Sequence, residues 1–330
     1  MNVLVTGGAG YVGSHAVAQL LAAGHDVRVW DNLSRGHAAS IPAELLIRGS
    51  LSERERLTSV LREHRIDAVM HFAAYALVAE SVANPSLYYE NNVLGTLSLL
   101  DAMHDADVGR IVFSSTCATY GIPEKVPISE DTPQAPVNPY GYTKLVIERA
   151  LADYAHAYGL GYAALRYFNA CGADPEARRG EDHEPETHAI PLALLAALGK
   201  RDGFTILGTD YPTPDGTCVR DYVHVDDLAD AHLRALDRLR PGEGLRLNLG
   251  TGRGFSVREV VDSAQRVSGR DIPVTTGDRR PGDPPELVAD PTRAQQVLGW
   301  KPRYTEIDAI METAWHWHET HPDGYAGSAS

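Results

Sequence analysis

The stretch "NVLVTGGAGYVG", residues 2–13, decides the fold, because it has the pattern of a buried strand followed by a glycine-rich turn and the start of a helix. Gly7, Gly10 and Gly13 allow a tight turn, a close approach of a phosphate to the backbone, and close packing of helix against strand. The free amide groups at the start of the helix supply donors to a pyrophosphate. The stretch therefore predicts a dinucleotide-binding turn after the first strand.

An acidic residue in the second expected strand specifies the dinucleotide. Asp31 ends the run "DVRVWD" (26–31). A carboxylate at this point accepts hydrogen bonds from the hydroxyls of the adenosine ribose. It also repels a 2′-phosphate, so we predict NAD rather than NADP as the cofactor.

The first half of the chain alternates short apolar runs with segments of helical length. The expected strands are "NVLVTGG" (2–8), "DVRVWD" (26–31), "AVMHFAA" (68–74), "RIVFSST" (110–116) and "YAALRYFN" (162–169), and the expected helices cover about 13–24, 53–64, 87–104 and 139–158. Strands separated by crossover helices form a parallel sheet with helices on both faces. We therefore predict an α/β protein with a Rossmann-type doubly wound parallel sheet.

The pattern changes after Asn169. Residues 172–188 are polar and charged, and shorter mixed elements follow them. We predict an NAD-binding Rossmann domain over residues 1–170 and a smaller α/β substrate-binding lobe over residues 171–330. Some segments of the second part are expected to return to the main sheet, with "RDYVHV" (220–225) and "LRLNLG" (245–250) as the candidates.

Charge and cysteine content limit the partners and the compartment. The net charge of −14 disfavours nucleic acid and anionic membranes, since both require a cationic surface. Cys117, Cys171 and Cys218 form no CxxC pair, which is typical of a reduced, cytoplasmic protein without disulfides. The first residues contain neither a basic region nor a long apolar run, so we expect no signal peptide and no membrane span.

The run "NPYGYTK" (138–144) places Tyr140 one helical turn before Lys144, so both side chains share one face of a helix. The run "FSST" ends the expected strand 110–116 with Thr116, at the sheet edge where ligands bind in such folds. A phenol, with its ordinary pKa of about 10, is a poor base at neutral pH. A nearby ammonium group or a cationic nicotinamide ring lowers that pKa. We therefore predict Tyr140 as the catalytic acid/base, Lys144 as the residue that tunes it, and Thr116 as the group that holds the substrate hydroxyl.

Several longer motifs carry a family resemblance. "TGGAGYVGSH" (6–15), "FSSTCATYG" (113–121), "NPYGYTK" (138–144), "LRYFNACGA" (165–173) and "GTDYPTPDGTCVRDYVHVDDLADAH" (208–232) closely resemble the UDP-glucose 4-epimerases, a family of extended short-chain dehydrogenases/reductases. The resemblance extends from residue 1 to about residue 322. It implies an isomerase of galactose and nucleotide-sugar metabolism that interconverts UDP-glucose and UDP-galactose through a transient 4-ketose, with tightly bound NAD.

The resemblance also implies the binding residues. For NAD they are Gly7, Gly10, Tyr11, Val12, Gly13, Asp31, Asn32, Leu33, Ser50, Leu51, Phe72, Ala73, Ala74, Asn91, Ser114, Tyr140, Lys144 and Tyr167. For the UDP-hexose they are Thr116, Tyr140, Phe168, Asn169, His188, Ala189, Thr205, Leu207, Arg220, Arg280, Asp283 and Leu287. Two arginines on a diphosphate supply the local positive field that so acidic a protein requires.

Some positions depart from the family pattern. Ser50 replaces the aspartate that often contacts adenine, and Ala76 replaces a lysine found in some members. Leu287 stands where some members place a tyrosine against the sugar, so N-acetylated sugars are a further predicted substrate class. UDP-pentoses remain another alternative.

Other functions are less well supported by the residues. A nucleotide-sugar 4,6-dehydratase needs an acid/base pair directly after the strand-end threonine, where this chain has Cys117 and Ala118. A catalytically inactive NAD-binding regulator is expected to lack Tyr140 or Lys144, and the chain has both.

No metal site is predicted from the sequence. The segment "WHWHETH" (315–321) is one residue short of the HExxH spacing, and His183 and His188 are expected in a solvated loop. A homodimer is expected by resemblance, paired through the helices at 87–104 and 139–158.

Overall fold

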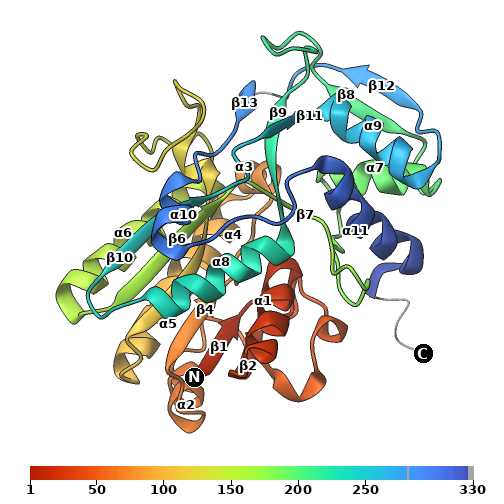
Figure 1. The fold of residues 1–330 in the computed structure, drawn as a ribbon. Coiled ribbons are helices and arrows are strands. Elements are labelled where there is room, and N and C mark those ends of the chain that lie inside the picture. The colour runs from red at the N-terminus through yellow and green to blue at the C-terminus, as the bar shows by residue number, and fades with distance from the viewer. Residues whose placement is uncertain (281, 326–330) are drawn as a thin grey trace.

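The computed structural model describes residues 1–280 and 282–325, and its centre is a seven-stranded parallel sheet in the order β10-β6-β5-β4-β1-β2-β3 (Figure 1). The strands are β1 (Asn2–Thr6), β2 (Asp26–Asp31), β3 (Leu46–Arg48), β4 (Ala68–His71), β5 (Arg110–Thr116), β6 (Gly161–Tyr167) and β10 (Gly244–Leu249). The chain order reverses between β1 and β4, which is the switch point where ligands bind in doubly wound sheets. The predicted fold class is therefore confirmed, with β3 as a strand that the apolar pattern did not predict.

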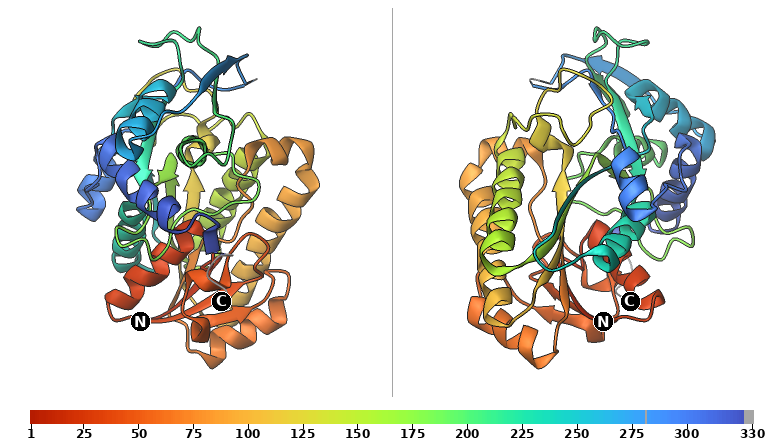
Figure 2. Two further views of the ribbon diagram at one scale, coloured as in Figure 1. Left: turned by 90° about the vertical axis from the view of Figure 1, so that its right-hand side faces the viewer. Right: turned by 60° about the vertical axis from the view of Figure 1, so that its left-hand side comes forward.

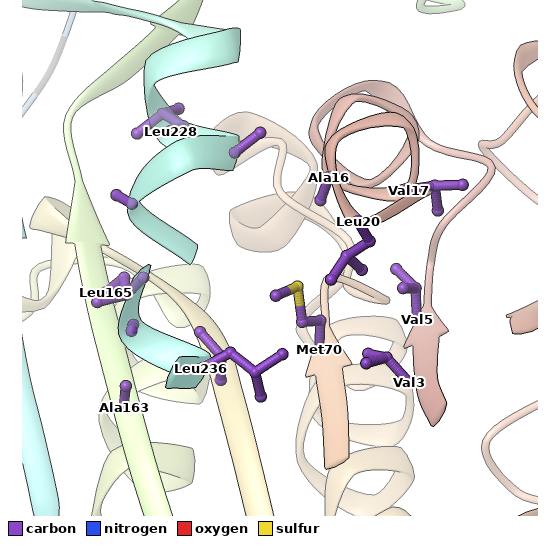
Figure 3. Packing of buried hydrophobic residues seen from close by; sticks show 14 of the residues in the cluster. Val3, Val5, Ala16, Val17, Leu20, Met70, Ala163, Leu165, Leu228 and Leu236 are labelled. Atoms are coloured by element: carbon purple, nitrogen blue, oxygen red, sulfur yellow. The ribbon is translucent and has the colours of Figure 1, made fainter. Parts of the chain in front are cut away.

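Helices cover both faces of this sheet, which Figure 2 shows between its two helical layers. One layer contains α1 (Tyr11–Ala22), α8 (Val225–Arg238) and α10 (Thr292–Leu298), and the other contains α2 (Arg54–Glu63), α5 (Gly95–Asp105) and α6 (Pro139–Tyr158). The first layer packs on the sheet through one apolar cluster, in which the side chains of Leu20 (α1) and Leu236 (α8) meet that of Met70 (β4) (Figure 3). All three are buried, as parallel strands with two covered faces require.

The predicted helix over 87–104 is interrupted in the structure. It divides into α4 (Pro85–Tyr88), a π-helical segment at Tyr89–Leu94 and α5, and α3 (Val78–Ala83) precedes it. The wide π turn contains Asn91 and the buried Asn92, whose amide donates to the carbonyl of Tyr75 at 3.0 Å. Such single π turns are frequent at functional sites, and this one faces the cofactor turn.

The later part of the chain forms a second group of elements. The helices α7 (Ala189–Ala197), α9 (Val257–Ser268) and α11 (Ile307–Thr320) share one apolar core with residues of the two-stranded sheet of β8 (Phe204–Leu207) and β12 (Val274–Gly277). A four-stranded sheet is made of β7 (Asn169–Cys171), β9 (Val219–His224), β11 (Gly254–Ser256) and β13 (Glu286–Leu287). Short 3₁₀ turns lie at Ala38–Ser40, Ala43–Leu45 and Cys117–Tyr120.

The two segments considered for a return to the main sheet behave differently. "LRLNLG" lies mostly in β10 and is the edge strand beside β6. "RDYVHV" lies mostly in β9, which pairs with β7, β11 and β13 outside the main sheet. The division near residue 170 stays a prediction about packing.

An ion pair is buried behind the end of β5. Arg166 of β6 and Glu148 of α6 are each 2% exposed at the side chain, and the guanidinium reaches the carboxylate at 2.5 Å. Glu148 also accepts from Ser115 Oγ at 2.5 Å and from Gln134 Nε2 at 3.1 Å. This network fixes β5 to α6, the two elements that carry Thr116, Tyr140 and Lys144.

We expect Arg166→Met to lower the free energy of unfolding by about 3–5 kcal/mol, because it leaves a buried carboxylate without its partner. Urea denaturation followed by circular dichroism measures the change. The double variant Arg166→Met/Glu148→Met should lose less free energy of unfolding than the single variant. The control Arg149→Met, on the exposed side of α6, should keep its free energy of unfolding within about 0.5 kcal/mol of the wild type. Equal losses in the single and double variants would contradict this account.

Candidate active site

The glycines of the turn after β1 are required by close backbone contacts. Gly7 has a φ of +72°, and a Cβ on it would lie 2.4 Å from the amide nitrogen of Ala73. A Cβ on Gly13 would lie 2.2 Å from the carbonyl oxygen of Gly7, so only glycine lets α1 pack this closely. Gly10 precedes the first turn of α1, which leaves the helix N-terminus open toward a ligand.

Asp31 ends β2 beside this turn. Its carboxylate accepts from the amide of Ala9 at 3.0 Å and from that of Leu33 at 2.8 Å. Burial raises the pKa of Asp31, and the two amide hydrogen bonds oppose the rise. A carboxylate oxygen accepts more than one hydrogen bond, so Asp31 keeps acceptor capacity for a ribose hydroxyl.

A cleft with an empty volume of about 540 Å³ opens along these strand ends. Of the predicted cofactor residues, the lining contains Gly7, Gly10, Asp31, Asn32, Leu51, Phe72, Ala73, Ala74 and Asn91. It also contains residues that the sequence analysis missed, namely Trp30, Ser34, Arg35, Gly36, Gly49 and Tyr75. Gly36 packs against the glycine turn, since a Cβ on it would lie 2.9 Å from the backbone of Ala9.

Other predicted cofactor residues lie outside the lining of this cleft. The Tyr11 hydroxyl donates to the carbonyl of Gly172 at 2.6 Å, and Val12 and Leu33 pack against the main core. Ser50 adjoins the cleft residues Gly49 and Leu51, with its hydroxyl 3.0 Å from that of Ser52. Their role in binding NAD stays a prediction.

The predicted catalytic groups meet beyond the end of β5. Lys144 is 2% exposed, its ammonium donates to the carbonyl of Ser114 at 2.8 Å, and it lies 5.9 Å from the ring centre of Tyr140. The Ser114 hydroxyl contacts the hydroxyl of Tyr167. Thr116 ends β5, and its side chain lowers the pKa of Tyr140, so the two residues lie close together. The helical spacing and the end of β5 thus bring the predicted acid/base, cation and hydroxyl to one place.

The pKa values in this group differ from the simple expectation. Burial raises the pKa of Tyr140 above its ordinary value, and Tyr167 adds to the rise while Thr116 opposes it. Burial lowers the pKa of Lys144 to about 7, although Glu148 acts in the opposite direction. The proximity of Lys144 therefore does not by itself produce a phenolate, and a further positive charge beside Tyr140 is needed.

The predicted substrate residues gather around β9 and β13. Arg220 donates to Asp283 at 2.9 Å, so the predicted diphosphate ligand and the predicted ribose acceptor form an ion pair. The Asn169 amide donates to the carbonyl of Asp221 at 3.1 Å. Arg280 is exposed next to residue 281, which lies outside the described range.

The remaining predicted substrate residues fall into three groups. Phe168 and Leu287 pack in one apolar cluster with Cys117, the residue after Thr116. Thr205 and Leu207 lie on the exposed face of β8. His188 and Ala189 begin α7. The structure brings the first group beside the catalytic hydroxyl, and the contacts of all three groups with substrate stay predictions.

Residues 3–250 match the model of the NAD dependent epimerase/dehydratase family. The chain belongs to this family. The UDP-glucose 4-epimerase of Rhizobium meliloti (strain 1021) is 54% identical over 324 residues, which cover 98% of each chain. Among solved structures, the UDP-glucose 4-epimerase from Brucella ovis in complex with NAD is 50% identical, with a TM-score of 0.92 and 96% of this chain and 98% of that chain covered. The UDP-glucose 4-epimerase from Bifidobacterium longum in complex with NAD⁺ and UDP is 37% identical, with a TM-score of 0.93. The match covers 98% of this chain and 100% of that chain.

The cleft of this member of the epimerase/dehydratase family fits an NAD molecule. The glycines let the turn pack closely against Ala73 and the start of α1, Gly7 and Gly10 line the cleft, and Asp31 adds a carboxylate to the same lining. Gly7 and Gly10 would hold the pyrophosphate, Asp31 the adenosine ribose, and Lys144 the nicotinamide ribose.

We expect Asp31→Ala to weaken NADH binding by roughly tenfold to a hundredfold, because hydrogen bonds to a charged acceptor are lost. The affinity for NADPH should fall much less, since the carboxylate that repels its 2′-phosphate is removed as well. Fluorescence titration of the NAD-stripped protein measures both affinities. Asp26→Ala, at the exposed start of the same strand, is the control. Equal weakening of NADH and NADPH binding would show that Asp31 only supports the turn.

Proposed function

We propose that this protein is an NAD-dependent UDP-glucose 4-epimerase, an isomerase that interconverts UDP-glucose and UDP-galactose through a transient 4-ketose. The observation that carries the proposal is the meeting of Tyr140, Lys144 and Thr116 beyond the end of β5, on the same edge of the sheet as the dinucleotide turn. Identities of 50% or more to named UDP-glucose 4-epimerases over nearly the whole chain support it. Bound NAD supplies reversible hydride transfer at C4 of the hexose.

The residues of the chain carry the proton chemistry. Tyr140 takes the proton of the 4-hydroxyl when the sugar is oxidised and returns it to the same oxygen after the ketose has turned its other face toward the cofactor. Thr116 hydrogen-bonds the same hydroxyl and keeps it directed at Tyr140. The Lys144 ammonium and the positive nicotinamide ring together stabilise the phenolate against the cost of burial. Without the nicotinamide ring the pKa of Tyr140 stays raised by burial, although the Lys144 ammonium lies 5.9 Å from its ring centre.

The substrate residues hold the part of the molecule that does not react. Arg220 is well placed to exchange its pairing with Asp283 for a bidentate contact to the diphosphate. Asp283 is then released to accept from the uridine ribose. Such anchoring leaves the hexose free to turn between the two hydride transfers.

The residue at position 287 suggests a second substrate class. Leu287 packs beside Phe168 and Cys117, where a larger tyrosine would narrow the site. UDP-N-acetylhexosamines are therefore an alternative substrate class, which a comparison of UDP-galactose with its N-acetyl analogue tests directly. UDP-pentoses are smaller and would not need the space beside Leu287. A catalytically inactive regulator would not require Tyr140, Lys144 and Thr116 to lie together.

We further propose a cytoplasmic homodimer. Tyr89, Leu94, Tyr142 and Val146 are exposed on the two helical segments that the sequence indicated as an interface, and Leu94 is 60% exposed. Two further apolar residues of α6, Leu151 and Ala155, lie in the core and are not part of this exposed surface. Within the described residues, no helix is long and apolar enough to cross a bilayer.

The first test is proton NMR of UDP-galactose with purified protein and no added cofactor. We expect conversion to UDP-glucose, because tightly bound NAD is retained through purification. Absence of conversion even after NAD is supplied would contradict the UDP-galactose assignment.

The matched variants are Tyr140→Phe and Tyr142→Phe, which lie on opposite sides of one helix. We expect Tyr140→Phe to lower kcat by about 10²- to 10⁴-fold through loss of the acid/base, with little change in UDP binding. Tyr142 is 48% exposed, and its variant should keep wild-type turnover. Comparable activity of Tyr140→Phe and the wild type would refute the assigned role.

A further inference from the structure

Four potential ligand side chains converge in the segment before α7. The ligand atoms of Glu181, His183, Glu186 and His188 all lie within 4.8 Å of one another. The Nδ1 atom of His188 is 2.8 Å from Glu181 Oε1 and 3.0 Å from Glu186 Oε1. Both carboxylates are largely shielded, with side-chain exposures of 5% and 9%. The loop is therefore exposed at His188, as the sequence predicted, but it shields the two carboxylates.

One nitrogen of the group points at the cluster without a hydrogen bond. Among the residues that the structure describes, His183 Nδ1 is one of few buried polar atoms that lack a hydrogen-bond partner. It nevertheless lies 3.1 Å from Glu181 Oε1 and 3.7 Å from Glu186 Oε2. This nitrogen is therefore close to two carboxylate oxygens without forming a hydrogen bond to either. Ligands of a tetrahedral Zn²⁺ are spaced by about 3.4 Å, which lies within the range of these distances.

The charge of the group favours a divalent cation. Two carboxylates with two neutral imidazoles carry two negative charges, and buried carboxylates require a compensating positive charge.

The segment connects the cofactor turn with the start of α7. The ring of His183 lies edge-on to that of Tyr11 at 6.1 Å, and Arg35 donates to the carbonyl of Glu184 at 2.9 Å. His188 is the residue directly before α7. Fixing this segment would therefore fix both the glycine turn and the predicted substrate-facing end of α7.

We propose that Glu181, His183, Glu186 and His188 bind one divalent transition-metal cation, with Zn²⁺ as the best match, in a structural site between the cofactor turn and α7. Two imidazoles and two carboxylates form a donor set that Zn²⁺ accepts in four-coordinate geometry. The inference departs from the sequence-based expectation of no metal site, because the spacing H-x-x-E-x-H within a loop gave no ligand geometry. It does not rest on the proposed epimerase function, and its readouts are binding and stability.

The test uses the full chain without an affinity tag, treated with a chelator and then titrated with Zn²⁺ or Co²⁺. We expect one Zn²⁺ per chain by elemental analysis after gel filtration, and intense visible absorption of tetrahedral Co²⁺ that Zn²⁺ abolishes. His183→Gln and Glu186→Gln should each weaken binding at least tenfold. The control His316→Gln removes an exposed imidazole of α11 and should bind as the wild type does.

Two further readouts separate a metal site from a network of ion pairs. Zn²⁺ should raise the melting temperature of the wild type and of His316→Gln but not of the two ligand variants. Affinity should fall as the pH falls, because the metal displaces protons from the imidazoles. Substoichiometric binding, or equal binding by the ligand variants and the wild type, would overturn the proposal even if the variants fold normally by circular dichroism.

Discussion

The hydrogen bond from the buried ammonium of Lys144 to the carbonyl of Ser114 is the interaction on which the active site depends. Removing a lysine from water is costly, and here the cost is visible as a pKa lowered to about 7. The carbonyl at the end of β5 compensates part of this cost and fixes the ammonium beneath Tyr140. The same dry surroundings raise the pKa of Tyr140. We therefore propose that the phenol acts as a base only when further positive charge lies beside it, which would couple reactivity to the presence of the cofactor.

The rest of the structure serves to keep this arrangement in place. The Arg166–Glu148 ion pair joins β6 to α6 directly behind β5, and Ser115 donates to the same carboxylate. The strand order brings the dinucleotide turn to the carboxyl edge on which Thr116 also lies. β9, in a separate sheet, carries Arg220 with its partner Asp283, so the predicted cofactor residues and the predicted substrate residues come from different parts of the chain.

Local patterns were sufficient for much of this account. The glycine spacing after β1 and the four-residue step from Tyr140 to Lys144 are fixed by backbone geometry, so they could be recognised in the sequence. Features that depend on tertiary contacts could not be recognised in the sequence. Trp30 and Tyr75 line the cleft only because the strands and the π turn bring them there, and the pairing of Arg220 with Asp283 joins residues 63 positions apart. The convergence of His183 and His188 on two glutamates depends on how residues 181–188 fold back, which no helical or strand period encodes.

The most direct measurement of the central claim is the ultraviolet titration of Tyr140 in NAD-loaded protein, obtained as the difference between the wild type and Tyr140→Phe. We expect the phenol to ionise well below its ordinary pKa of about 10 when NAD is bound, and Lys144→Met to raise this pKa by more than one unit. A titration of Tyr140 that is the same with Lys144 and with methionine at that position would contradict the claim that the buried ammonium prepares the base.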